Sequence, residues 1–202
     1  MKKLIKYIFY LSISSTFFFP NKTNAQNIDV DILKAINPRY PTSQYWVQTS
    51  ASAYWVPVAF SLGTLAYGLI KNDTNTKVKA YEAFISIGSA IVFTELLKPI
   101  IHRARPGDAY PTEIFPNSAT HGGSFPSGHT TLAFSTAATI AIQYKKWYIV
   151  VPAYLWAASV GYSRMYLGKH YPSDVIAGAA IGIGSAYLSH WVTKKLFKKT
   201  VR

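Results

Sequence analysis

The feature that most constrains this chain is a series of five apolar segments separated by short polar stretches. They span residues 51–70, 80–101, 130–144, 147–163 and 174–193. A segment that crosses a bilayer must satisfy its own backbone hydrogen bonds, so apolar runs of this length predict transmembrane helices. Glu82 and Glu95 weaken the second run and would have to face the bundle interior or the membrane interface, and Lys145 shortens the third. We expect an all-α integral-membrane bundle of five to six transmembrane helices.

The N-terminus has the pattern of a secretory signal peptide. Three lysines among the first six residues precede an apolar stretch from Leu4 to Phe19, and small residues follow at Thr23-Asn24-Ala25. We expect cleavage after Ala25. The alternative is an uncleaved first transmembrane helix, although the stretch is shorter than the roughly 20 apolar residues that a full span needs.

These patterns divide the chain into four parts. They are a signal peptide or first helix at 1–25, a periplasmic or interfacial segment at 26–50, a helical core at 51–193 and a basic cytoplasmic tail at 194–202. Within the second part, Ile28–Ile36 has the composition of a short amphipathic helix that lies on the membrane surface.

The positive charge is distributed asymmetrically. Lysines gather in the 71–79 loop, at Lys145-Lys146 and in the 194–202 tail, which follow alternate apolar segments. The positive-inside rule places all three stretches in the cytoplasm, whether or not the N-terminus is cleaved, and the opposite connections in the periplasm. We therefore expect a multi-pass protein of the bacterial cytoplasmic (inner) membrane. The net charge of +13 comes with no nucleic-acid-binding motif, so we expect no nucleic-acid partner.

The positions of aromatic and small residues also indicate a membrane-spanning helical bundle. Trp46 and Tyr54 are among several aromatic residues near segment ends, where an aromatic belt would lie. Gly178, Gly182 and Ala186 recur every four residues in the last segment, which predicts close packing against another helix.

Three polar stretches lie at the ends of the apolar segments that we assign to the periplasm. The first contains Lys98 and Arg105. Because prolines follow both residues, we expect the helix to loosen at Lys98 and the chain to turn outward at Arg105. Both side chains can then bind one anion, arginine bidentately and lysine as a point charge. The alternative is that they are ordinary positive residues flanking a span.

The second stretch, Pro126-Ser127-Gly128-His129, directly precedes an apolar helical run. Ser127 is a suitable N-cap, backbone N–H groups at a helix start bind anions, and Gly128 lets a phosphate approach closely. His129 would then lie in the first turn, where it could protonate a leaving alkoxide. The alternative is a simple helix start with a surface histidine.

The third stretch contains Arg164, His170 and Asp174. Pro172-Ser173 indicates a helix start between His170 and Asp174. Asp174 could accept the imidazole N–H and leave the other nitrogen free to attack phosphorus, while Arg164 neutralises charge on the equatorial oxygens. The alternative is a helix-capping pair and an interfacial arginine.

Together these stretches resemble the type 2 phosphatidic acid phosphatase superfamily, which also includes bacterial class A acid phosphatases and vanadium haloperoxidases. The pattern is Lys-x6-Arg-Pro, Pro-Ser-Gly-His and Ser-Arg-x5-His-x3-Asp, matched at every position over roughly residues 52–193. The resemblance implies that the phosphate is bound by Lys98, Arg105, Ser127, Gly128 and Arg164. It implies that His170 is the nucleophile, oriented by Asp174, and that it forms a phosphohistidine. It further implies that His129 is the general acid and then the base, and that no metal or other cofactor takes part.

Some residues near the motifs match no motif position. They are His102, Arg103 and His121, of which we expect the two histidines to be solvated loop residues. The Pro- and Gly-rich stretch 107–124 is expected to form the outer wall of the pocket, where a headgroup would be selected.

The expected function is a membrane lipid phosphatase whose substrate keeps its tail in the bilayer. The resemblance favours isoprenyl diphosphate and is compatible with phosphatidylglycerol phosphate, phosphatidic acid or a lipid A phosphate. We expect the lipid bilayer and this substrate as partners, and no obligate protein partner. The alternatives are a secreted soluble acid phosphatase acting on small phosphomonoesters, a vanadium haloperoxidase, and a phospholipid-binding or transport protein without turnover.

Overall fold

The computed structural model describes residues 24–119 and 121–197, and all regular structure in this part of the chain is helical, as predicted. The helices are α2 (Asn24–Ile36), α3 (Gln44–Ile70), α4 (Thr74–Ile101), α5 (Pro106–Ala109), α6 (Gly128–Tyr144), α7 (Trp147–Tyr166) and α8 (Pro172–Leu196). The apolar stretch of the predicted signal peptide and the last residues of the basic tail lie outside the described residues.

Each of the five apolar segments forms one long helix, and α3 differs most from its predicted bounds. It begins at Gln44 rather than at residue 51. Trp46 lies in this added part and packs against the rings of Tyr162 and Tyr166 on α7, with centroid distances of 4.7 and 5.9 Å. The start of α3 is therefore stabilised by tertiary contacts that apolar periodicity does not reveal.

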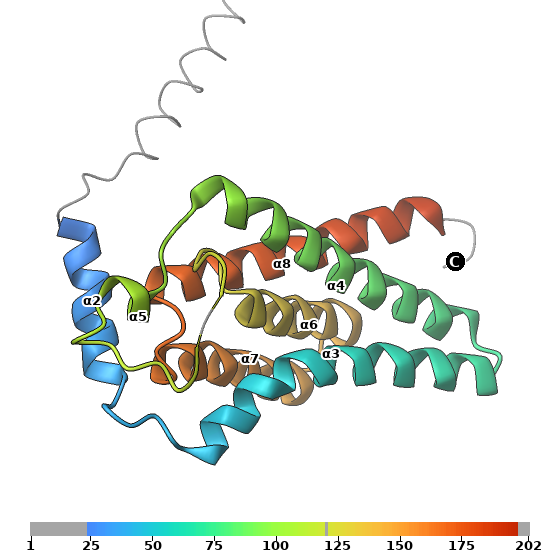
Figure 1. Cartoon of the computed structure of the whole chain (residues 1–202). Helices are drawn as coiled ribbons and strands as arrows, with labels where there is room; N and C mark the ends of the chain where they lie inside the picture. The colour runs from blue at the N-terminus through green and yellow to red at the C-terminus, as the bar shows by residue number, and fades with distance from the viewer. Residues whose placement is uncertain (1–23, 120, 198–202) are drawn as a thin grey trace, which may run out of the picture.

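Helix α6 lies at the centre of the bundle and contacts α3, α4, α7 and α8 (Figure 1). The small-residue stripe of α8 makes the closest of these contacts. A Cβ at Gly178 would come within 2.7 Å of the Ser127 carbonyl oxygen, and one at Gly182 would overlap the main chain of α6. The close packing predicted for this stripe is confirmed.

Among the residues that the structure describes, three segments are long and apolar enough to cross a membrane: Gln44–Ile70, Thr74–Ala109 and Pro172–Leu196. The expectation that Glu82 and Glu95 weaken the second was wrong, because that segment has the highest mean hydropathy of the three. Glu82 is buried inside the bundle, and Glu95 lies near the end of α4. Helix α6, which contacts all four other bundle helices, has 17 residues and is shorter than these three segments.

The two ends of the bundle differ (Figure 1). One end carries α2, α5 and the long connection between α4 and α6, while the other carries the turns at α3–α4 and α6–α7. The helix predicted over Ile28–Ile36 is present as α2, but its buried residues Val30 and Leu33 pack against Ile114 and Tyr171. This helix therefore covers one end of the bundle.

Candidate active site

A cavity of about 280 Å³ opens at the end of the bundle covered by α2. Six of the eight predicted site residues line it: Lys98, Arg105, Gly128, His129, Arg164 and His170. They come from the end of α4, the turn after it, the start of α6, the end of α7 and the turn before α8. Ser127 and Asp174 are fully buried behind the cavity rather than on its wall.

His170 has one ring nitrogen held by the protein and the other directed toward the cations of the cavity. Its Nδ1 lies 2.8 Å from the main-chain oxygen of Ser124. Because a carbonyl oxygen can only accept, Nδ1 carries the proton and Nε2 keeps its lone pair. Nε2 lies 3.5 Å from Arg105 Nη1. This is the tautomer that a nitrogen nucleophile requires.

Burial is the main reason why His170 stays neutral. Burial, together with the positive charges of Arg164 and Arg105 and against the opposing effect of Asp174, lowers the pKa of His170 to about 4. The imidazole is therefore uncharged over the whole physiological pH range.

Asp174 differs from its predicted geometry. Its Oδ2 lies 3.5 Å from His170 Nδ1, so the Ser124 carbonyl, rather than Asp174, is the close acceptor of the imidazole proton. The same Oδ2 accepts hydrogen bonds from Ser124 Oγ at 2.6 Å and from the Tyr171 N–H at 3.0 Å. Asp174 lies in the first turn of α8, where its carboxylate caps the helix. Asp174 is thus linked to His170 directly, at 3.5 Å, and also through Ser124.

Arg103, which matches no motif position, joins Asp174 to the N-terminal helix. Its Nη1 donates to Asp174 Oδ1 at 2.7 Å, and its Nη2 donates to Asp29 Oδ2 on α2 at 2.6 Å. The guanidinium lies 3.9 Å above the Tyr171 ring. Asp29 Oδ1 also accepts the main-chain N–H of Ser173 at 2.9 Å. A continuous hydrogen-bond network thus runs from α2 to the residues that hold His170.

The three cationic side chains of the cavity are each held differently. Lys98 pairs with Glu95 one turn earlier, at 2.5 Å. Arg105 donates to the main-chain oxygens of Lys169, His121 and Gly122, each at 3.2 Å. Arg164 is buried and donates from Nη1 to Ser50 Oγ on α3 at 2.5 Å.

Two buried polar atoms of cavity residues have no hydrogen-bond partner within the described part of the chain: Arg164 Nε and Thr94 Oγ1. An unpaired buried donor costs about 1–3 kcal/mol. A bound oxyanion would accept from both groups and would add its charge to the cations around it. The cavity therefore has the donor set of an anion site.

The start of α6 has the predicted form with one difference. Ser127 is the N-cap residue, but its hydroxyl pairs with Thr130 Oγ1 at 2.9 Å and does not reach the cavity. The first N–H groups of α6, that of Gly128 included, remain to contact an anion. His129 packs edge-on against Tyr54 of α3, with centroids 4.5 Å apart.

The described residues of the 107–124 connection support the site and do not line the cavity, contrary to our expectation of an outer wall. Its main-chain oxygens hold Arg105 and His170, and Ser118 accepts from Lys169 Nζ. Burial lowers the pKa of Lys169 to about 8. His121 is exposed and contributes its main-chain oxygen; His102 is exposed and ends α4 in the left-handed conformation.

Sequence reasoning missed five contributors to the site: Asp29, Ser50, Tyr54, Arg103 and Ser124. Tyr54 was assigned to the aromatic belt. A signal existed for Arg103, which stands two residues before Arg105 in the first motif. Asp29 and Ser50 are remote in sequence from the residues they contact, so only the fold brings them to the site.

The chain matches the model of the PAP2 superfamily over residues 79–198. It is 29% identical to the lipid A 4'-phosphatase of Bacteroides thetaiotaomicron, over 84% of this chain and 79% of that protein. It is 30% identical to the undecaprenyl-diphosphatase of Sulfolobus acidocaldarius, over 81% of this chain and 79% of that protein.

A solved structure has the same fold. It is the crystal structure of a transmembrane PAP2 type phosphatidylglycerolphosphate phosphatase from Bacillus subtilis, which matches with a TM-score of 0.66 and covers 100% of both chains at 21% identity. The apolar helices of the bundle are thus those of a multi-pass membrane protein.

Proposed function

Because this chain belongs to the PAP2 superfamily, we propose that it hydrolyses a lipid phosphomonoester or diphosphate through a phosphohistidine on His170. The chain is a membrane phosphatase, and its relatives favour this activity over that of a secreted soluble acid phosphatase. The assignment of His170 as the nucleophile rests on one observation. The unprotonated Nε2 of His170 shares a cavity with Lys98, Arg105, Arg164 and a second histidine.

In the first step the three cations and the N–H groups at the start of α6 bind the phosphate, and Nε2 of His170 attacks phosphorus. A nitrogen–phosphorus bond forms as the bond to the leaving oxygen breaks. His129 gives its proton to that oxygen. The negative charge of the bound phosphate favours the protonated form of His129 before transfer. The Ser124 carbonyl stabilises the positive charge on the His170 ring through Nδ1–H.

In the second step a water molecule attacks phosphorus and gives a proton to His129. The nitrogen–phosphorus bond breaks, its electron pair returns to Nε2, and inorganic phosphate leaves. His170 and His129 are then in their starting states. Every proton in this cycle is carried by these two side chains, the substrate and water, so the proposed reaction uses no metal.

The substrate and the orientation form the second part of the proposal. We assign the cavity end of the bundle to the periplasmic side of the cytoplasmic membrane, since the lysine-rich turns lie at the other end. All five long helices would span the membrane, and residues 51–193 would form the catalytic core. A periplasmic segment would precede this core, and the basic cytoplasmic tail would follow it. Ile91 lines the cavity and is half exposed on α4, which suits a substrate tail lying along that helix.

The relatives' substrates give the panel for the test. Detergent-purified protein in excess EDTA is given lipid A, undecaprenyl diphosphate, phosphatidylglycerol phosphate, phosphatidic acid and water-soluble monoesters, and phosphate release is measured. We expect release from at least one lipid phosphate, with undecaprenyl diphosphate the favoured substrate, and none from the His170→Ala variant. Release from soluble monoesters alone would contradict the lipid substrate, and loss of activity in EDTA would contradict the metal-free reaction.

A further inference from the structure

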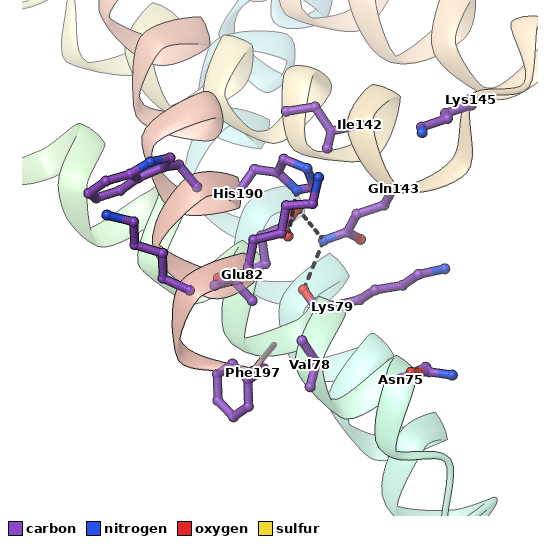
Figure 2. A pocket seen from close by; sticks show the side chains of 13 residues that line it. Asn75, Val78, Lys79, Glu82, Ile142, Gln143, Lys145, His190 and Phe197 are labelled. Atoms are coloured by element: carbon purple, nitrogen blue, oxygen red, sulfur yellow. Dashed lines mark hydrogen bonds and ion pairs between the residues drawn. The ribbon is translucent and has the colours of Figure 1, made fainter. Parts of the chain in front are cut away.

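A second and larger cavity, of about 800 Å³, lies at the end of the bundle away from the candidate active site. It is formed by the first turns of α4 and the last turns of α6 and α8 (Figure 2). Glu82 in this cavity and Lys98 in the catalytic one are about 24 Å apart along α4, at 1.5 Å per residue. The two cavities therefore face opposite sides of a membrane that the bundle spans.

The lining of this cavity carries a strong excess of positive charge. Lys79, Lys145, Lys194 and Lys195 line it from α4, the end of α6 and α8. Of the described residues that line it, Glu82 is the single acidic one, against four lysines. These lysines come from three elements and line one cavity, so the cavity is cationic and attracts a phosphate.

The interior of the cavity carries hydrogen-bond acceptors. Glu82, with 6% of its surface exposed, contacts His190 Nδ1 at 3.1 Å and accepts from Gln143 Nε2 at 3.5 Å, as Figure 2 shows. Gln143 Nε2 also donates to the Lys79 carbonyl oxygen at 2.9 Å. Within the described residues, Gln143 Oε1 and the hydroxyl of Thr193, which is 2% exposed, have no hydrogen-bond partner. A ligand that brings donors would satisfy these atoms.

The walls are apolar and reach the outer surface of the bundle. Val78, Ile142 and Trp191 line the cavity, and Trp191 is half exposed on α8. The ammonium of Lys195 lies 3.9 Å from the Trp191 ring centre. A tryptophan with a lysine beside it is typical of the membrane interface. This lining suits a ligand with acyl chains better than a free anion.

We propose that this cavity binds a phospholipid of the leaflet opposite the active site, whose headgroup joins a phosphate to a hydrogen-bond-donating ammonium. The lysines contact the phosphate, the ammonium lies near Glu82 and Gln143 Oε1, and the acyl chains follow the apolar wall beside Trp191. The site is separate from the candidate active site, and only the choice of leaflet rests on the proposed function.

The test measures binding of phosphatidylethanolamine to detergent-purified protein by native mass spectrometry. The variant Lys194→Gln/Lys195→Gln removes two cations of the cavity. A matched control, Lys71→Gln/Lys146→Gln, removes two lysines at the same end that do not line it. We expect binding about thirtyfold weaker in the first variant and unchanged in the control. Hydrolysis of a detergent-dispersed substrate should be unchanged in both, which shows that they are folded.

Headgroup chemistry gives a second readout. Phosphatidylcholine carries a phosphate but no N–H donor, so the wild-type protein should bind it more weakly than phosphatidylethanolamine. Gln143→Leu should abolish this preference by removing an acceptor. Equal loss of binding in both lysine variants, equal binding of the two lipids by the wild-type protein, or displacement of the lipid by excess inorganic phosphate would each overturn the proposal.

Discussion

At the residue scale, His170 depends on groups that its motif does not contain. The Ser124 carbonyl fixes its proton on Nδ1, and Asp174 holds the Ser124 hydroxyl in place. Arg103 in turn neutralises the buried charge of Asp174. The nucleophile that we propose is therefore positioned by a chain of contacts, each with a hydrogen-bond distance below 3 Å.

Substitution of the two cavity histidines tests their proposed roles. His170→Ala and His129→Ala should each lower kcat at least about a hundredfold, the scale of losing a nucleophile or a general acid. Arg164→Ala should also act mainly on kcat, because it meets charge that grows in the transition state. Initial rates at saturating concentrations of the best lipid substrate measure kcat for each variant. His102→Ala, at an exposed position outside the cavity, is the control and should keep the wild-type rate.

Arg103 should behave as a positioning residue. Arg103→Ala leaves the Asp174 carboxylate buried without its cation, so we expect kcat to fall about tenfold or more with little change in KM. Asp29→Asn, which keeps the size of the residue at the far end of the network, should have a smaller effect in the same direction. A change confined to KM would show that Arg103 contacts substrate instead.

A pH titration should reflect the lowered pKa of His170. The pKa of this group in the folded protein is about 4, below the ordinary value near 6.5, so the ring remains unprotonated as pH falls through 6 and 5. Because His129 must also be protonated in the first step, the His170 ring is followed directly by NMR in the His129→Ala variant, where it should stay unprotonated down to about pH 5 and titrate near pH 4. A titration midpoint near pH 6.5 would contradict the burial of the free imidazole.

At the element scale, the contact between α6 and α8 holds the start of α6 against the start of α8. The Ser127 N–H donates to the Asp174 carbonyl oxygen at 3.1 Å, and Gly178 lets the two helices approach at that level. The motif histidine on α6 and the carboxylate on α8 are thereby placed in one rigid unit. Small residues in α8 thus contribute to the geometry of the site.

Two glycines of α8 provide a matched test of this packing. Gly182→Ala should lower the melting temperature, since its methyl group would overlap the main chain of α6 and overpacking costs about 1–3 kcal/mol. Gly184→Ala introduces the same methyl group where nothing lies within 4 Å, and should leave stability unchanged or raise it. Thermal unfolding in detergent compares the two, and equal melting temperatures would contradict the close contact.

At the scale of the whole molecule, polar chemistry is separated between the two ends of one bundle. One end holds the cavity with two histidines and three cations, and the other holds the lysine-rich cavity. Most of the large exposed apolar side chains lie on α3, α4, α7 and α8. This distribution is that of a protein whose ends contact two different aqueous phases.

The proposed orientation can be tested because the chain contains no cysteine. Asp108→Cys introduces a thiol on α5 at the catalytic end, and Lys146→Cys introduces one at the opposite end. A membrane-impermeant maleimide should label the first in intact bacterial cells with a permeable outer membrane. The second should react only after the inner membrane is opened. The reverse pattern would place the active site in the cytoplasm.

The helical class, the five long helices and six residues that line the candidate active-site cavity could be predicted from the amino-acid sequence alone. This was possible because bilayer spans and phosphate chemistry both require particular residue types at short, regular spacings. The contacts of Asp29, Ser50 and Arg103 join positions that are more than 70 residues apart. Such contacts follow from how helices pack, so only the tertiary structure revealed them. It also placed Ser127 behind the cavity and put the Ser124 carbonyl, rather than the motif carboxylate, against the imidazole proton.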